Sequence, residues 1–146
     1  MSKVSKLINN LSWDMPEDLQ KSAINQLELI NENELPLLIQ PKGKECWENA
    51  AKVLGKIGYP RVKLIIPELL EWLKDMNWPG SWTIMELLEG IDRDELLPHI
   101  ESALIKATKE DDDIWISAIK ELVERTELTE LDFSSHDIFR LLDLGE

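Results

Sequence analysis

The amino-acid sequence predicts an all-α fold, a right-handed α-solenoid of about four helix pairs that forms one domain over residues 1–146. Three observations predict this fold. Apolar residues recur at helical spacing in several segments, and no segment shows the strict alternation of a strand. Short breaks rich in turn residues separate these segments. Proline and tryptophan also recur at intervals of 31 to 35 residues, which is typical of arrays of paired helices.

The helical periodicity is clearest in two segments, residues 61–76 and 113–126, where apolar side chains stand three or four positions apart. Glycine, proline or aspartate occupies the breaks on either side. Asp92 and Asp112 are well placed to begin helices, because a carboxylate accepts the unpaired N–H groups of a first turn. Eight helices are expected, over residues 16–31, 34–40, 44–58, 61–75, 79–90, 93–108, 112–126 and 129–143.

Proline marks one helix of each expected pair. Pro36, Pro67 and Pro98 each follow an apolar residue, and successive prolines are 31 residues apart. Proline is tolerated in the first turn of a helix because its missing N–H has no intrahelical partner there. The three prolines are therefore expected in the first turn of the second helix of successive pairs.

Tryptophan marks the other helix of each pair. Trp47, Trp82 and Trp115 recur at intervals of 35 and 33 residues, each early in its expected helix. Side chains at equivalent repeat positions form a row along such an array. This row has two interpretations: a buried seam between the layers, or a line of exposed aromatic anchors for a partner.

Two resemblances follow from these motifs. The paired-helix repeat resembles HEAT and HEAT-like helical arrays over most of the chain. More narrowly, residues 71–80, which read Glu-Trp-Leu-Lys-Asp-Met-Asn-Trp-Pro-Gly, resemble the motif of an uncharacterised bacterial family of short all-helical chains. The first resemblance implies a fold. The second implies kinship and no particular activity.

Charge is distributed unevenly along the chain, whose formal net charge is −13. Residues 1–63 carry nine Lys/Arg against eight Asp/Glu, whereas residues 64–146 carry seven against 21. Nucleic acids and anionic membranes require positive charge on the protein, so neither is expected as a partner. The DNA glycosylases that resemble HEAT arrays are disfavoured for the same reason. The acidic half instead predicts an electrostatic surface for a basic protein, with Glu121, Glu124 and Glu127 spaced along one helical face.

The stretch from Asp75 to Trp82 is the most unusual part of the sequence. Aspartate and asparagine form turns by bonding local backbone, and a residue before proline is kept out of the helical region. One interpretation is a structural corner in which Trp78 fills the core. The alternative is a recognition corner, where Asp75 and Asn77 offer polar groups beside Trp78 and Trp82.

The sequence contains no motif that indicates catalysis or metal binding. His99 and His136 fall in no ligand pattern, and no nucleophile or phosphate-loop motif occurs. No catalytic residue, metal or cofactor is therefore expected. Cys46 lies near an expected helix start, which could lower its thiol pKa, but no partner base is visible. The lone cysteine, the lack of a signal-peptide pattern and the lack of an apolar run of ~20 residues favour the cytoplasm.

The leading functional hypothesis is a non-enzymatic protein–protein interaction module. In its most specific form it is an acidic inhibitor or immunity-type protein that masks a basic partner, with carboxylates where phosphates would otherwise sit. The alternative is an enzyme or small-ligand binder with its site at the Asp75–Trp82 corner. A structural adaptor without a charged target is a third option. The sequence indicates no oligomeric state.

Overall fold

The computed structural model describes residues 2–145, and every regular element in that range is a helix. None of these helices is both long and apolar enough to cross a bilayer. The α-helices are α1 (Lys3–Asn9), α2 (Glu17–Leu27), α3 (Trp47–Ile57), α4 (Ile66–Glu71), α5 (Ser81–Glu89), α6 (Arg93–Lys109), α7 (Asp113–Arg125) and α8 (His136–Arg140). Short 3₁₀ segments are η1 (Glu32–Leu38), η2 (Lys44–Cys46), η3 (Lys63–Ile65), η4 (Trp72–Lys74) and η5 (Leu141–Leu144).

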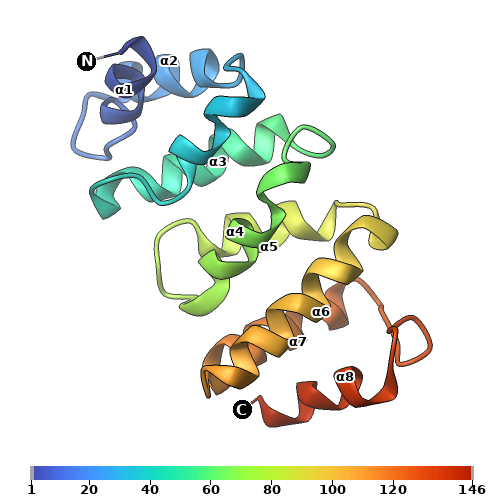
Figure 1. Cartoon of the computed structure of the whole chain (residues 1–146). Helices are drawn as coiled ribbons and strands as arrows, with labels where there is room; N and C mark the ends of the chain where they lie inside the picture. The colour runs from blue at the N-terminus through green and yellow to red at the C-terminus, as the bar shows by residue number, and fades with distance from the viewer. Residues whose placement is uncertain (1, 146) are drawn as a thin grey trace.

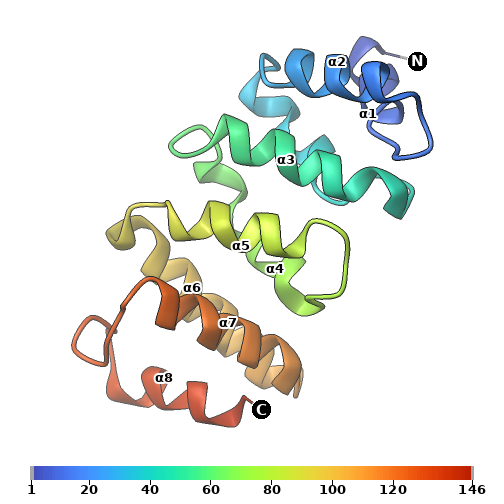
Figure 2. The ribbon, with the colours of Figure 1, turned by 180° about the vertical axis from the view of Figure 1, so that it is seen from behind.

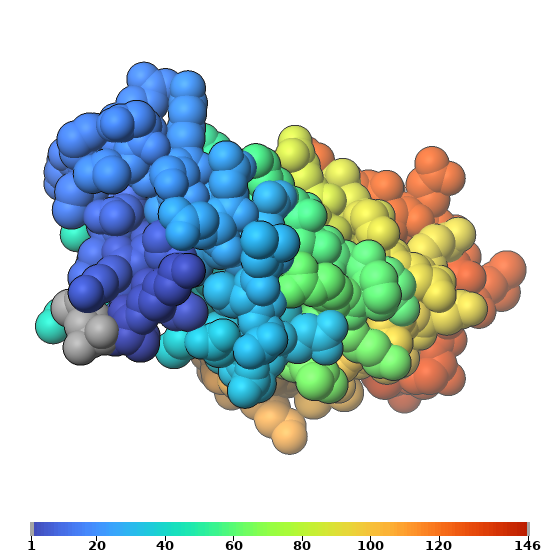
Figure 3. Space-filling view, turned by 90° about the horizontal axis from the view of Figure 1, so that it is seen from above, coloured from blue at the N-terminus to red at the C-terminus, as the bar shows by residue number. Residues whose placement is uncertain are grey.

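The helices are arranged in two layers (Figure 1). In one layer α2, α3, α5 and α7 lie side by side and run in the same direction, as Figure 2 shows from behind. The other layer holds α1, η1, α4 and α6. The chain alternates between the layers and advances along them, so its colour changes steadily from blue at one end of the molecule to red at the other (Figure 3). We call the row of α2, α3, α5 and α7 the parallel face.

A continuous hydrophobic core lies between the two layers. Helix α3 illustrates the pattern, since Ala50, Val53 and Leu54 stand three or four positions apart and are fully buried. Trp72 and Trp115 are the largest side chains that are fully buried. At the C-terminal end, η5 packs against α6 and α7 with Leu142 buried, so the core is closed by a last helical segment.

Both predicted aspartate caps are present. The Asp112 carboxylate accepts the Trp115 N–H at 3.0 Å and begins α7, and Asp92 accepts the Asp94 N–H at 3.3 Å and begins α6. The five expected helices between residues 44 and 126 all occur, with short 3₁₀ turns at some of their ends.

The expected helices at the two ends of the chain were wrong in part. Residues 34–40 were expected as a helix, but a 3₁₀ segment covers Glu32–Leu38, and α1 was not expected at all. The expected helix over 129–143 begins only at His136. Asp132 there accepts the Thr129 N–H at 2.8 Å and closes a turn. The Ser135 hydroxyl then caps α8 by accepting the Ile138 N–H at 3.1 Å.

The prediction for the prolines was also wrong in part. Pro67 lies in the first turn of α4, as expected. Pro36 and Pro98 lie inside η1 and α6. The reason in α6 is the Asp92 cap, which starts the helix one turn earlier than the proline does. The 31-residue spacing therefore does not mark helix starts.

Candidate functional site

Residues 75–80 form a corner between η4 and α5 that is held together by its own hydrogen bonds. The Asp75 carboxylate accepts the Asn77 N–H at 2.8 Å, which makes an Asx turn. The buried Ser81 hydroxyl lies within hydrogen-bond distance of the Asp75 carbonyl at 2.9 Å and the Trp72 carbonyl at 3.1 Å. The polar groups that the sequence offered for recognition are thus engaged inside the turn, except for the exposed Asn77 side chain.

Three tryptophans and a glycine fill the space behind this corner. The Trp47 ring stands edge-on to Trp72 and Trp78, with centroids 6.2 and 5.7 Å away. The Trp72 indole N–H donates to the Pro79 carbonyl at 3.1 Å. Gly80 has a φ of +88°, and a Cβ there would lie 2.8 Å from Ala51 Cβ. Trp78 is half-buried in this cluster, which agrees with the structural interpretation of the corner.

The tryptophans of the predicted row do not share one environment. Trp115 is 1% exposed and donates its indole N–H to the Leu70 carbonyl at 3.0 Å. Trp47 is half-buried and donates to the Pro41 carbonyl at 2.6 Å. Trp82, by contrast, is 52% exposed. Neither interpretation of the row holds for all three, because only one member is fully buried.

Trp82 belongs to a charged cluster on α5 and α7. The Arg125 guanidinium lies 5.4 Å from the Trp82 ring centroid, within reach of a cation–π interaction. Arg125 also donates to Glu89 at 2.8 Å and to Glu121 at 2.7 Å. These hydrogen bonds, to Glu89 first and then to Glu121, raise the pKa of Arg125. Trp82 and Glu121 therefore both contact Arg125, whereas Trp78 packs against Trp47 in the corner.

The three glutamates chosen from the sequence are not equivalent. Glu121 pairs with Arg125, which it shares with Glu89. Glu124 is exposed on α7, whereas Glu127 lies beyond the end of the helix with a φ of +58°. The expectation that all three share one helical face was wrong for Glu127, because α7 ends at Arg125. Within residues 2–145, neither Glu124 nor Glu127 forms an ion pair, and the same is true of Glu86 on α5.

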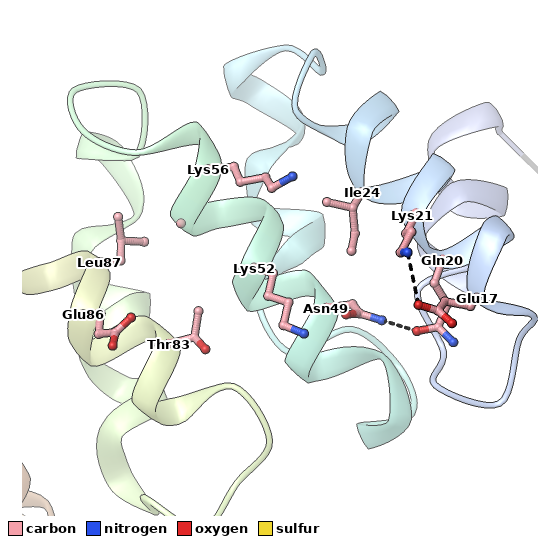
Figure 4. Close-up of a pocket in the computed structure, with 11 residues that line it drawn as sticks. Glu17, Gln20, Lys21, Ile24, Asn49, Lys52, Lys56, Thr83, Glu86 and Leu87 are labelled. Atoms are coloured by element: carbon pink, nitrogen blue, oxygen red, sulfur yellow. Dashed lines mark hydrogen bonds and ion pairs between the residues drawn. The ribbon is translucent and has the colours of Figure 1, made fainter.

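A groove of about 610 Å³ crosses the parallel face, over α3 and between α2 and α5 (Figure 4). Most of the residues that line it are polar or charged, and the apolar Ile24 and Leu87 stand on the two outer helices. Asn49 fixes one wall, because its amide nitrogen donates to the Leu11 carbonyl at 2.7 Å and to the Gln20 side chain at 2.8 Å. The lining residues are Glu17, Gln20, Lys21, Ile24, Asn49, Lys52, Gly55, Lys56, Thr83, Glu86 and Leu87.

A family model described as "Domain of unknown function (DUF5071)" matches residues 39–137. The chain belongs to the DUF5071 family. No curated protein and no solved structure matches it. The DUF5071 match contains the corner, the Trp82 cluster and the α3 and α5 sides of the groove, but it leaves out α2.

The floor of the groove in this DUF5071 protein contains a glycine that the fold does not explain. Gly55 lies in the last turn of α3, where glycine is still less favourable than alanine, by up to about 1 kcal/mol. A Cβ at this position would meet nothing closer than Thr83 Cγ2 at 4.0 Å. No backbone angle and no neighbouring atom therefore requires glycine here. The residue leaves open space above the helix, in the groove.

Two further features considered from the sequence are the Cys46 thiol and a metal site. Cys46 is buried, and burial, with a smaller contribution from Glu45, raises the pKa of its thiol. The lowered value considered from the sequence was therefore wrong. Among the described residues no group of three or more His, Cys, Asp or Glu is placed to hold a metal ion.

The sequence reasoning missed the groove. Its one local signal was the pair Lys52 and Lys56, which stand four positions apart and so share a helix face.

Proposed function

We propose that this DUF5071 chain is a non-enzymatic protein-interaction module of the cytoplasm that binds a basic partner protein. We further propose that its two layers are a right-handed, HEAT-like α-solenoid. The alternation of the chain between two layers and the parallel course of α2, α3, α5 and α7 support the fold proposal. Arrays of this kind present extended surfaces that suit protein partners.

The observation that carries the functional proposal is the unpaired negative charge beside Trp82. Glu86 and Glu124 are exposed on α5 and α7, which are neighbours in the parallel face. Exposed tryptophan is common at the centre of interfaces, and surrounding carboxylates favour a basic partner. Trp82 is half exposed and lies beside Arg125, so a partner would meet an apolar ring next to a charged side chain that is already held in place.

Long-range attraction is the physical basis of such binding. Exposed charges speed association at low salt, and they are screened beyond ~8 Å at physiological ionic strength. An acidic surface that covers the cationic groove of a partner would act as an inhibitor of that partner. This is the immunity-type role in its most specific form.

The proposal can be tested by affinity capture from a lysate of the native host at low salt, followed by elution across a salt gradient. We expect a basic protein that elutes early. The variant Glu86→Lys/Glu124→Lys/Glu127→Lys should retain at least about tenfold less of it, the equivalent of ~1.4 kcal/mol. Its folding should be unchanged, because none of these side chains forms an ion pair within the described range.

The matched control is Glu28→Lys/Glu32→Lys/Glu34→Lys, which changes the net charge equally but lies in the first half of the chain. This control should retain the partner. Loss of binding in both variants would show that only total charge matters. Capture of partners that are not basic would contradict the proposal.

A further inference from the structure

The groove over α3 gathers lysines in a chain whose net charge is strongly negative. Lys52 and Lys56 are exposed on one face of α3, about one turn apart. Within residues 2–145 neither ammonium group forms an ion pair with a carboxylate. Lys21 faces them from α2 and pairs with Glu17 at 3.1 Å. The positive charge of Lys52 and Lys56 is thus left for something outside the chain.

Gly55 lies between these two lysines and opens the floor of the groove. A side chain there would project toward Thr83 without a clash, so glycine is not needed for the packing of α3 on α5. What glycine does supply is close access to the helix backbone. A main chain laid along the groove could approach α3 at this point and nowhere else between Lys52 and Lys56.

We propose that this groove is the docking site for an acidic peptide segment of a partner protein. Its carboxylates meet Lys52 and Lys56, and its backbone passes close to Gly55. Ile24 and Leu87 line the groove from α2 and α5, on opposite sides of the lysines, and they accept apolar side chains of the same segment (Figure 4). The Asn49 hydrogen bond to Gln20 holds α2 against α3 before anything binds, and its bond to the Leu11 carbonyl ties α3 to the segment that precedes α2.

A peptide fits the groove better than a compact metabolite does. Small-molecule sites enclose most of the ligand surface, whereas this groove is open to solvent and spans three helices. Its lining carries three lysines against two glutamates, and the unpaired Lys52 and Lys56 favour an acidic segment over the basic partner of the acidic half. The inference therefore goes beyond the proposed function. It rests on Lys52, Lys56 and Gly55 and on a partner segment of opposite charge, and Glu86, which lines the groove from α5, is the one residue that the two proposals share. Charge reversal of the two lysines leaves Glu124 and Glu127 unchanged, so either proposal can fail alone.

The test is a selection of random 12-residue peptides displayed on phage against the full chain, with binding of the selected peptides then measured by fluorescence polarisation. We expect enrichment of peptides with paired Asp or Glu residues. The charge reversal Lys52→Glu/Lys56→Glu and the filling variant Gly55→Gln should each weaken binding at least about tenfold. Lys42→Glu/Lys109→Glu, which changes two exposed lysines outside the groove, should bind like the natural chain.

A second measurement separates function from folding at Gly55. Gly55→Ala should raise Tm by about 2–4 °C, because alanine favours the helix and meets open space. A fall in Tm would show that the fold itself needs the glycine, and that would overturn the inference.

Three results of the peptide experiment would also overturn it. The first is a failure to enrich acidic peptides. The second is equal binding by the groove variants and the control. The third is a site for a small anion, seen when citrate or inorganic phosphate shifts the NMR signals of residues 49–56 while no peptide competes.

Discussion

Two connections of the same kind, residues 75–80 and residues 110–112, are built in different ways. Each leads from the layer of α4 and α6 into the parallel face. The first contains a glycine at positive φ and an Asx turn, and its Trp78 packs with Trp47 and Trp72 in a cluster of three tryptophans. The second needs only Asp111 at a φ of +52° and the Asp112 cap.

The difference follows from the length of the preceding helix. Helix α6 has 17 residues, so it is long enough for a three-residue connection to lead directly into α7. The helical stretch from Lys63 to Lys74 is shorter, so residues 75–80 must cover the remaining distance and fill the space beneath them. The unusual residues of the corner, 75–80, thus have a structural role in this connection. The comparison predicts that changes in the first connection destabilise the protein more than changes in the second.

The largest effect is expected for Trp72→Ala. Trp72 is fully buried and bonds to Pro79, so its removal leaves a cavity under the corner and should lower the free energy of unfolding by roughly 3–5 kcal/mol. The matched control is Trp82→Ala, which removes a half-exposed ring and should cost less than about 1 kcal/mol. Urea denaturation followed by circular dichroism measures both. Similar losses in the two variants would contradict the contrast between the buried corner and the exposed cluster.

A smaller effect is expected for Gly80→Ala. The new Cβ would stand 2.8 Å from Ala51 Cβ and 2.9 Å from the Trp47 carbonyl, in a left-handed backbone conformation. Strain and overpacking together should cost roughly 2–4 kcal/mol in free energy of unfolding. Gly90→Ala is the control, since Gly90 has a φ of −85° and its nearest atom would be 3.5 Å away. Equal stability of the two variants would show that the corner relaxes freely around residue 80.

Much of the fold could be predicted from the sequence, because helix periodicity and caps are local signals. The α5, α6 and α7 helices were expected to within a few residues for this reason. The environment of each tryptophan could not be predicted from spacing. Trp47 is the first residue of α3, Trp82 the second of α5 and Trp115 the third of α7. Each shift of one position turns a side chain by about 100° around the helix axis, so the three rings point in different directions.

The groove was beyond prediction for a different reason. Its lining comes from three segments that are far apart in the sequence, and its depth depends on how α2 and α5 stand beside α3. The glycine that opens it is a single residue in a periodic helix. Only the structure shows that the space above Gly55 is empty.

The smallest effect on stability is expected at the second connection, residues 110–112. Asp112→Ala removes the acceptor of the Trp115 N–H and should lower the free energy of unfolding by about 1 kcal/mol, the usual cost of losing a cap. Asp112→Asn should keep most of the stability, because asparagine accepts the same bond. Hydrogen exchange should show the loss confined to the first turn of α7. The connection contains no aromatic ring and no glycine at positive φ, so no such group depends on Asp112 in the way that the corner depends on Trp72. A loss as large as that of Trp72→Ala, or one that spreads into α6, would mean that the short connection is coupled to the core, and the contrast between the two connections would fail.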